Sequence, residues 1–600
     1  MNIQRRQALA GSLAATALPL LGASSTHAAA HAATAPTPSP ATQALHALFA
    51  RYWEDSARRS PEWATFRGDH RFGDKWSDLS PAGIAERDAQ EARWLAEARA
   101  IAPDSLSLTD RRSREMFIHG REANQRMAGF DGWRTMLIGS LRGSQTLLAN
   151  MLQAVPVDTE PQVEQLLTRL DTYPARLAQE IARMNTGITL GWVPPKPVLQ
   201  RSLAQLDGQL KAVLKTGPLF EPFRKLGRTI PEARRVALAE RGEAVLTARV
   251  LPALQSLRSF IIDHYLPAAP EAGGLLRYKG GDVVYAELVR DQTTTALTPA
   301  QIHQMGRDEL ARLRGEIHKV MADMKFGGSF PEFAAHLRQP KYFYPDADAM
   351  FDGYRVAAKR LDPEMTRLFA ELPRAPYGIR PMAAHLGPAA ADNYNRPSDD
   401  GRRPGWYNAN TLAFGRRPRW AVPTLVAHET VPGHHTQNAR AMELGDLPAF
   451  RRNGGYTAFG EGWALFAETL CDDIGLFDTP EDRYGHLQAQ AFRASRLVVD
   501  TGLHALGWTR QQAIDSMVAD VADSPIFVES EVDRYLSNPG QALAYMVGKQ
   551  RMVGLREKAR AALGGKFDAR RFNNAVIDQG ALPLDVLSTQ IDEWVALTGA

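Results

Sequence analysis

Apolar residues recur at helical spacing along most of the chain from residue 41 onward. Leu45, Leu48, Phe49 and Trp53 fall on one face of a helix. Similar stretches follow, separated by segments that contain proline and glycine, at residues 85–100, 163–184, 231–257 and 299–324. The sequence shows no fixed-period repeat and no alternation of short strands and helices of the kind that builds a doubly wound sheet. The pattern therefore predicts a mainly helical protein.

Residues 377–411 interrupt this helical pattern. They are rich in proline, glycine and asparagine and include a short extended piece from Trp406 to Thr411. This composition indicates strand and turn rather than helix. Helical spacing returns at Val422 and continues toward the end of the chain. We therefore expect a mainly α fold, with one large helical domain over residues 41–600 and a small β element.

The composition is that of an ordinary soluble globular protein. The chain has 600 residues, of which 44% are hydrophobic and 23% charged, and its formal net charge is only +4. Lysines and arginines are scattered among acidic residues, which argues against nucleic acid as a partner. The single cysteine, Cys471, cannot form an internal disulfide and follows an apolar run. We expect it to pack as a small apolar residue.

The N-terminus has the pattern of an export signal. Arg5 and Arg6 precede an apolar stretch at residues 8–23, and small residues follow, as in a secretory signal peptide. We expect a signal peptide over residues 1–30, for which the arginine pair suggests the twin-arginine type, and a linker over residues 31–40. No cysteine follows the leader, so the expectation is a periplasmic or secreted protein without a stable membrane anchor after cleavage. An uncleaved anchor is the alternative.

Candidate chemistry is concentrated in one segment, His428-Glu429-Thr430-Val431-Pro432-Gly433-His434-His435. In an H-E-x-x-H helix, two histidines four residues apart bind zinc from one face, and the glutamate beside the first acts as a base. His428 and Glu429 supply the first half of such a motif. The second histidine is delayed, because Pro432 stands at its usual position.

The delay creates a geometric problem that a helix break would solve. On a straight helix His435 would share a face with His428 but lie roughly 10 Å further along the axis, too far to bind the same ion. Pro432 and Gly433 favour a break that would bring a later histidine back. His434 is the first choice for the second ligand because it needs the smaller displacement, and His435 stays open. The alternative is a polar helix end whose histidines cap carbonyl groups.

A third ligand is expected from residues 459–468, an apolar helical segment that carries Glu461 and Glu468. These glutamates are seven residues apart and so lie on one helix face. Glu461 is the expected ligand, and Glu468 is expected to orient a ligand histidine. Two histidines, one carboxylate and a water would suit one Zn²⁺ ion. Ordinary surface glutamates are the alternative, which the apolar neighbours Trp463 and Phe466 disfavour.

The extended piece from Trp406 to Thr411 is expected to lie beside the metal-binding helix as an edge strand. Peptides often bind such an edge as an added strand, so Asn408 and Asn410 are candidate substrate-binding residues. A plain connecting strand is the alternative.

The segments at residues 428–435 and 461–468 together resemble the DUF885 family. Further segments carry the same resemblance, at residues 60–65, 496–504, 531–535 and 539–542. The resemblance runs through most of the mature chain. That family is similar to the gluzincin metallopeptidases, whose third zinc ligand is a glutamate on a separate helix. The resemblance therefore implies a metallopeptidase-like helical domain with one zinc ion, whose catalytic part covers about residues 377–600.

The resemblance also implies catalytic roles. Glu429 would be the general base for a zinc-bound water. Tyr545 resembles the tyrosine that stabilises the oxyanion in related peptidases, and Tyr535 is a second candidate.

Three further residues are candidates for supporting roles. Arg534 would bind a substrate carboxylate, which suits its planar guanidinium group; an ion pair with Glu531 or Asp533 is the alternative. His504 and Asp500 are four residues apart on an expected helix and could transfer a proton or support the site. A buried core histidine is the alternative.

These features together predict an exported zinc-dependent peptidase that hydrolyses short peptides. A zinc-dependent amidase acting on a non-peptide amide is one alternative. A periplasmic binding protein with a degenerate metal site is another, which the intact set of candidate ligands disfavours.

Overall fold

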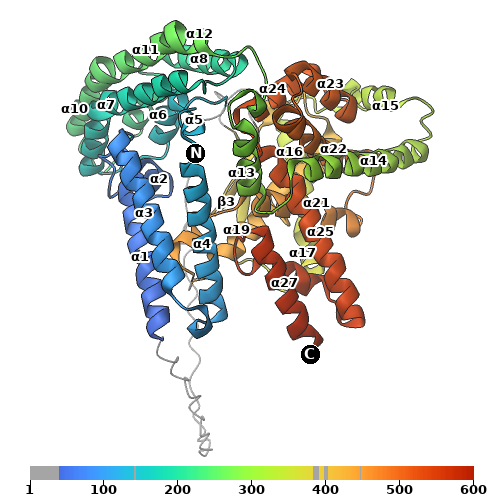
Figure 1. Ribbon diagram of the computed structural model, residues 1–600. Helices are drawn as coiled ribbons and strands as arrows, with labels where there is room; N and C mark the ends of the chain where they lie inside the picture. Colours follow the sequence, from blue (N-terminus) through green and yellow to red (C-terminus); the bar gives the residue numbers. More distant parts are fainter. Residues whose placement is uncertain (1–38, 141–142, 383–390, 398–402, 446) are drawn as a thin grey trace, which may run out of the picture.

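The computed structural model describes residues 39–140, 143–382, 391–397, 403–445 and 447–600. The expected leader and nearly all of the linker lie outside these ranges. Helices account for most of the described chain, and the one sheet among these residues is small, so the predicted mainly α fold is confirmed. Figure 1 shows two groups of helices side by side, one N-terminal (blue to green) and one C-terminal (green to red).

The N-terminal group begins at α1, where the side chain of Ser39 caps the first turn. Its helices are α1 (Pro40–Arg59), α2 (Pro61–Phe66), α3 (Pro81–Ala100), α4 (Leu108–Ala128), α5 (Asp131–Arg134), α6 (Ser144–Leu152), α7 (Glu160–Leu190), α8 (Lys196–Lys211), α9 (Glu221–Arg224), α10 (Glu232–Val245), α11 (Leu251–Phe260) and α12 (Leu266–Ala268).

One continuous helical stretch, Glu232–Ala268, joins α10 to α12 through two short π-helical segments. It is long and apolar enough to cross a membrane by length and composition alone. Its residues Leu238, Leu246, Leu254 and Leu257 are buried in a hydrophobic core that it shares with α7. Packing in this core accounts for its apolar face.

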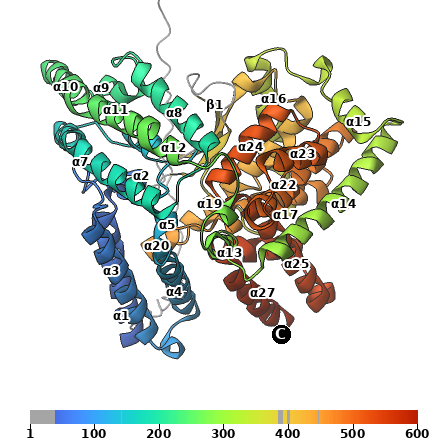
Figure 2. The same cartoon turned by 45° about the horizontal axis from the view of Figure 1, so that its top comes forward.

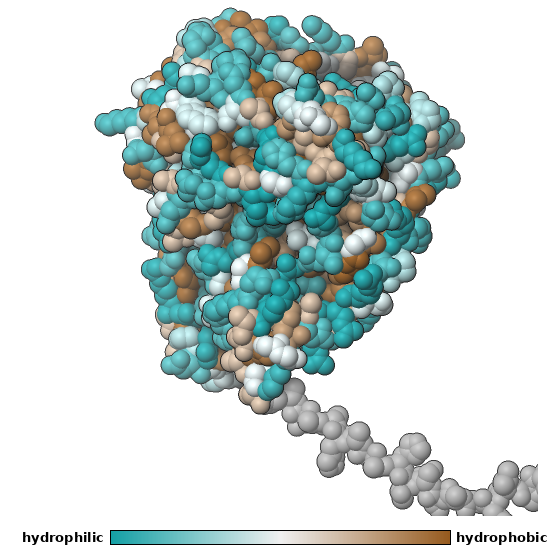
Figure 3. Space-filling view, turned by 90° about the vertical axis from the view of Figure 1, so that its right-hand side faces the viewer, coloured by the Kyte–Doolittle hydropathy of each residue, from teal (hydrophilic) through white to brown (hydrophobic). Residues whose placement is uncertain are grey.

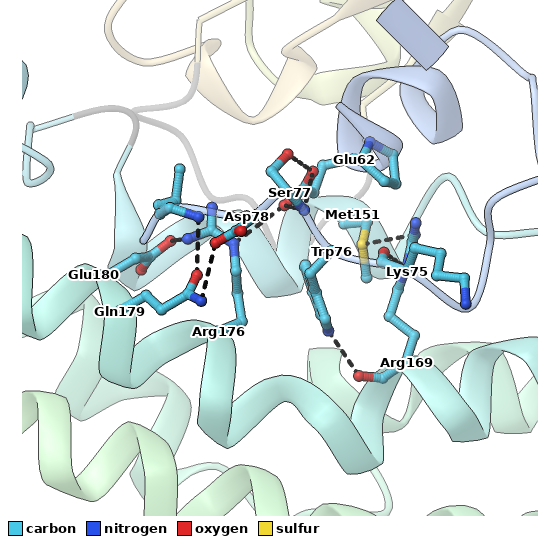
Figure 4. Close-up of polar contacts among 12 residues, drawn as sticks. Glu62, Lys75, Trp76, Ser77, Asp78, Met151, Arg169, Arg176, Gln179 and Glu180 are labelled. Atoms are coloured by element: carbon cyan, nitrogen blue, oxygen red, sulfur yellow. Dashed lines mark hydrogen bonds and ion pairs between the residues drawn. The ribbon is translucent and has the colours of Figure 1, made fainter. Parts of the chain in front are cut away.

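Buried polar groups fasten α2 and the loop that follows it to α7 (Figure 4). Glu62 on α2 accepts a hydrogen bond from the backbone N–H of Ser77 at 3.1 Å and pairs with Nε of Arg176 on α7 at 3.3 Å. Arg169, also on α7, donates to the carbonyl of Lys75 at 2.8 Å. These contacts give ion-pair or hydrogen-bond partners to charged groups that would be costly to bury alone.

The C-terminal group contains the remaining helices. They are α13 (Gly281–Thr293), α14 (Pro299–Asp323), α15 (Phe330–His336), α16 (Ala347–Leu361), α17 (Met365–Leu368), α18 (Val422–Glu429), α19 (His434–Met442), α20 (Ala449–Arg452), α21 (Thr457–Asp473), α22 (Pro480–Ala505), α23 (Arg510–Val521), α24 (Pro525–Ser537), α25 (Ala544–Leu563), α26 (Ala569–Ile577) and α27 (Leu584–Gly599). In both ribbon views α13 and α19 lie where the two groups meet (Figures 1 and 2).

The two groups are in direct contact. Nε of Arg126 on α4 pairs with Glu287 on α13 at 2.7 Å. The ring of Phe49 on α1 packs 4.8 Å from that of Phe450 on α20, centroid to centroid. The face seen in Figure 3 is largely hydrophilic with scattered hydrophobic residues, which is an ordinary surface for a folded protein.

The small sheet has three strands, β1 (Tyr377–Pro381), β2 (Asn393–Asn395) and β3 (Gly405–Ala409), in the order β1-β3-β2. β1 is parallel to β3, and β2 is antiparallel to it. β3 is therefore the middle strand. The expectation that Trp406–Thr411 forms an edge is wrong, because strands on both sides already use the backbone groups that an added peptide would need.

α21 and α25 cross at close range, and α21 also packs on α18. A Cβ at Gly462 would lie 2.5 Å from Cα of Gly548, and a Cβ at Gly548 would lie 1.9 Å from the carbonyl oxygen of Ala458. Only glycine fits at this distance. The crossing brings the N-terminal halves of the two helices together, and these halves carry Glu461 and Tyr545.

Candidate metal centre

A short turn separates α18 from α19 and supplies the expected helix break. α18 ends at Glu429, and α19 begins at His434. The N–H of Gly433 donates to the carbonyl of Ala427 at 3.0 Å. The indole N–H of Trp463, on α21, donates to the carbonyl of Pro432 at 3.1 Å. The turn is thus tied both to α18 and to the helix that carries Glu461.

Gly433 allows this turn to fold back on α18. A Cβ at this position would lie 2.0 Å from the carbonyl oxygen of His428 and 2.4 Å from that of Ala427. Both atoms belong to the helix backbone and cannot move without disturbing α18. The turn therefore requires glycine for close approach.

Replacing Gly433 with alanine should destabilise the protein. We expect the free energy of unfolding to fall by about 1–3 kcal/mol or more, because the added methyl group overlaps backbone atoms. Chemical denaturation would measure this change. Gly415→Ala is the matched control, since nothing lies within 4 Å of a Cβ there. Equal effects of the two substitutions would contradict this account of the turn.

The turn brings His428 and His434 together with Glu461. Nε2 of His428 lies 3.5 Å from Oε2 of Glu461, and Nε2 of His434 lies 3.4 Å from the same oxygen. One ligand atom from each residue lies within 4.8 Å of the others. His428 is buried, whereas 24% of the Glu461 side chain is exposed. The cluster therefore has an open side.

These separations suit a tetrahedral zinc ion. With bonds of about 2.0–2.2 Å, neighbouring ligands of tetrahedral zinc lie roughly 3.3–3.5 Å apart, and the two distances to Glu461 agree with this. Burial raises the pKa of Glu461, but the two imidazoles outweigh that effect and hold the pKa well below its usual range. The carboxylate is thus ionised, as a metal ligand must be.

Glu468 holds His428 in the orientation that a ligand needs. Its Oε1 lies 2.8 Å from Nδ1 of His428, and its Oε2 accepts hydrogen bonds from Thr424 Oγ1 and Gln490 Nε2, both at 3.0 Å. Burial raises the pKa of Glu468, while His428 lowers it, to about 2. An ionised Glu468 accepts a hydrogen bond from Nδ1–H of His428 and leaves Nε2 to face Glu461.

His435 points away from this cluster. Its Nδ1 lies 2.9 Å from the hydroxyl of Tyr394 on β2, and its Nε2 lies 2.9 Å from the carbonyl oxygen of Ala375. A carbonyl can only accept, so Nε2 donates there and Nδ1 accepts from Tyr394. Both ring nitrogens are in use. Of the two histidines that the sequence left open, the structure places His434 in the cluster.

Glu429 lies next to the cluster without being part of it. Its side chain is buried, and burial raises its pKa, against the opposing effect of His434 and His428. Among the described residues, its carboxylate has no hydrogen-bond or ion-pair partner. A carboxylate that is buried, unpaired and close to two imidazoles is available to accept a proton.

Tyr545 is the other predicted catalytic residue that lies near the cluster. Burial raises its pKa, and the charge of Glu461 raises it further. The guanidinium group of Arg496 lies over its ring, 4.6 Å from the centroid. The hydroxyl therefore stays protonated at neutral pH and can donate a hydrogen bond.

The buried Tyr535 and the partly buried Arg534 both bind Glu531 on α24. Tyr535 donates to Oε2 of Glu531 at 2.9 Å, and Arg534 binds both oxygens of Glu531, at 3.2 and 2.9 Å. Arg534 also donates to Gln541 at 2.7 Å. The ion pair with Glu531, which was the alternative for Arg534, is present. Tyr535 is fully buried, and its hydroxyl is engaged with Glu531.

His504 and Asp500 are buried and bound to other groups rather than to each other. Nδ1 of His504 accepts from the N–H of Leu275 at 3.1 Å, and its Nε2 lies 3.1 Å from the carbonyl oxygen of Tyr535. Asp500 accepts hydrogen bonds from Tyr285 and Gly540. Both nitrogens of His504 are in use, so it has the contacts of a core histidine.

Asn408 and Asn410 belong to the sheet region. Asn408, on β3, donates to Asn393 of β2 at 2.8 Å and accepts from Arg380 of β1 at 2.7 Å. The backbone N–H of Asn410 donates to Asp392. The side chain of Asn408 thus links the three strands.

Sequence reasoning missed several residues that complete the site. Thr424 and Gln490 bind Glu468, Tyr394 binds His435, and Arg496 covers Tyr545. Each acts across a contact between elements far apart in the sequence, so spacing along the chain carries no signal for it.

The fold and the cluster define a mainly helical protein with two histidines and a glutamate arranged as in a metal centre. The chain belongs to the family described as "Bacterial protein of unknown function (DUF885)", whose model matches residues 61–591. The family named from the sequence is thus confirmed.

Two solved structures share this fold. One is described as the "putative lipoprotein from Colwellia psychrerythraea"; it has 26% identity and a TM-score of 0.87, and the match covers 94% of this chain and 100% of that one. The other is "a putative lipoprotein of unknown function from Shewanella oneidensis", with 16% identity, a TM-score of 0.73 and coverage of 91% and 99%. No match is found among curated proteins.

Proposed function

We propose that this chain is an exported zinc-dependent hydrolase that cleaves peptide bonds in short peptides. The observation that carries the proposal is the cluster of His428, His434 and Glu461, with Glu429 beside it and Glu468 behind it. Two nitrogen ligands and one carboxylate, with an open side, suit a catalytic zinc site better than a closed structural one.

The chain's own residues provide the remaining parts of a hydrolytic site. Zinc, when bound by His428, His434 and Glu461, supplies Lewis-acid activation of water and of the substrate carbonyl. The carboxylate of Glu429 accepts the proton from the attacking water and passes it to the leaving amine. The hydroxyl of Tyr545 donates a hydrogen bond to the developing oxyanion.

Support for export comes from the leader and from the structural neighbours. Both neighbours are described by the words "putative lipoprotein". In this chain the only cysteine is Cys471, which is buried on α21. We therefore propose export by the predicted signal peptide.

Metal removal tests the proposal directly. Purified mature protein should contain about one zinc ion per chain and should cleave members of a pool of short peptides. A chelator such as 1,10-phenanthroline should abolish cleavage, and added zinc should restore it. Mass spectrometry would measure both the metal and the products. Protein that stays metal-free even after zinc addition would overturn the proposal. Zinc-loaded protein that cleaves non-peptide amides but no peptide would favour the amidase instead.

A further inference from the structure

Two arginines share one glutamate, Glu531, close to Tyr545. Nη2 of Arg496, on α22, lies 3.2 Å from Oε2 of Glu531, and Arg534 binds both oxygens of the same carboxylate. Nε of Arg496 donates to the Tyr535 hydroxyl at 3.1 Å. The cluster thus has two positive charges and one negative charge, and more than nine-tenths of Arg496 is buried.

One guanidinium nitrogen in this cluster lacks a partner. Nη1 of Arg496 is buried, and no hydrogen-bond acceptor among the described residues reaches it. In Arg534, by contrast, Nε and Nη2 bind Glu531 and Nη1 binds Gln541. Buried donors are usually satisfied in folded proteins, and this one, beside an excess positive charge, is suited to bind an added carboxylate.

Tyr545 connects this cluster to the candidate metal centre. The Arg496 guanidinium packs between the rings of Phe492 and Tyr545, 4.3 and 4.6 Å from their centroids. Tyr545 lies in the N-terminal part of α25, which crosses the Glu461-bearing α21 so closely that a Cβ at Gly462 would lie 2.5 Å from Cα of Gly548. Tyr545 therefore joins the Arg496 side chain to the helix that carries the candidate ligand Glu461.

We propose that Arg496, supported by Arg534, binds the C-terminal carboxylate of a peptide whose scissile bond lies at the metal centre. The inference rests on the proposed peptidase function and makes the enzyme an exopeptidase that acts from the C-terminus. A carboxylate would pair with Nη1 and balance the excess charge. Cleavage adds water across one peptide bond, giving a new carboxylate and a short fragment with a free amine, and needs no other co-reactant.

Binding can be tested without turnover. The probe is a pool of N-acetylated tetrapeptides, prepared as free acids and as C-terminal amides, added to zinc-loaded Glu429→Gln protein. Free acids should bind roughly tenfold to hundredfold more tightly than amides, as expected for a hydrogen bond to a charged group. Affinity capture with mass spectrometry would measure this ratio. Equal binding of acids and amides would overturn the inference whether or not peptides are cleaved.

The assignment to Arg496 is tested by substitution. Arg496→Gln should abolish the preference for acids over amides while the zinc content stays at the wild-type level. Arg483→Gln is the matched control, because Arg483 lies on the same helix but pairs with Asp472 at 3.0 Å, and it should keep the preference. If Arg496→Gln does not fold, the ratio of acid to amide binding by the Glu429→Gln protein still tests whether the C-terminal carboxylate is recognised. A retained preference in folded Arg496→Gln would overturn the assignment.

The products of wild-type cleavage distinguish this inference from the proposed function. The first fragment released from each peptide should carry the original C-terminus, and amidated peptides should be poor substrates. Internal cleavage of free and amidated peptides at equal rates would leave the peptidase proposal intact and overturn C-terminal recognition. Absence of any peptide cleavage would count against the peptidase proposal. The ratio of free-acid to amide binding would then show independently whether Arg496 binds a carboxylate.

Discussion

Glu429→Gln protein should keep its zinc and its fold but lose about 10²–10⁴-fold in kcat/KM, which is the usual contribution of a general base. The carboxamide has nearly the size of the carboxylate, so packing around the buried side chain is preserved. The carboxamide, however, cannot accept the proton of the attacking water. Because Glu429 has no hydrogen-bond partner among the described residues, its replacement breaks no contact that would disturb the metal ligands.

Steady-state kinetics with the best peptide of the pool, together with metal analysis, would measure this loss. Glu443→Gln is a suitable control. Glu443 follows α19 and pairs with Arg440 at 3.2 Å, so its replacement removes the same charge outside the cluster. A Glu429→Gln protein with normal kcat/KM would remove Glu429 from the mechanism. Loss of zinc in this variant would instead show that Glu429 helps to hold the metal.

The parts of the site that the sequence could predict are those fixed by local geometry. Pro432 and Gly433 break the helix whatever surrounds them, so the delayed second histidine could be foreseen from the backbone alone. Glu461 and Glu468 share a face of α21 because they are seven residues apart. The contact of Glu468 with His428 then follows once α18 packs on α21.

The parts that could not be predicted depend on packing between distant segments. His434 and His435 are neighbours in the sequence, and only the direction in which α19 leaves the turn separates their environments. β3 looked like an edge because nothing local shows that β1 and β2 flank it on both sides. Arg534 was the predicted partner of a substrate carboxylate, but it pairs with Glu531, and within that cluster the nitrogen without a partner is Nη1 of Arg496.

Substituting the two adjacent histidines should give opposite results for zinc. His434→Ala removes one of the three proposed zinc ligands, so we expect zinc affinity to fall by more than the 10–100-fold typical of losing an outer partner, with loss of activity. His435→Ala removes a side chain whose nitrogens bind Ala375 and Tyr394. The His435→Ala protein should keep its zinc. Its free energy of unfolding should fall by about 1–3 kcal/mol, because buried groups lose their hydrogen-bond partners.

Each histidine is the control for the other, because they have the same chemistry and occupy consecutive positions on one helix. Competition with a zinc-binding dye would measure affinity, and chemical denaturation would measure stability. If His435→Ala lost zinc and His434→Ala kept it, the metal would have to bind on the opposite face of α19, away from Glu461. Such a result would also separate the metal from Glu429, since the proposed mechanism requires His434, Glu461 and Glu429 to face the same open side of the cluster.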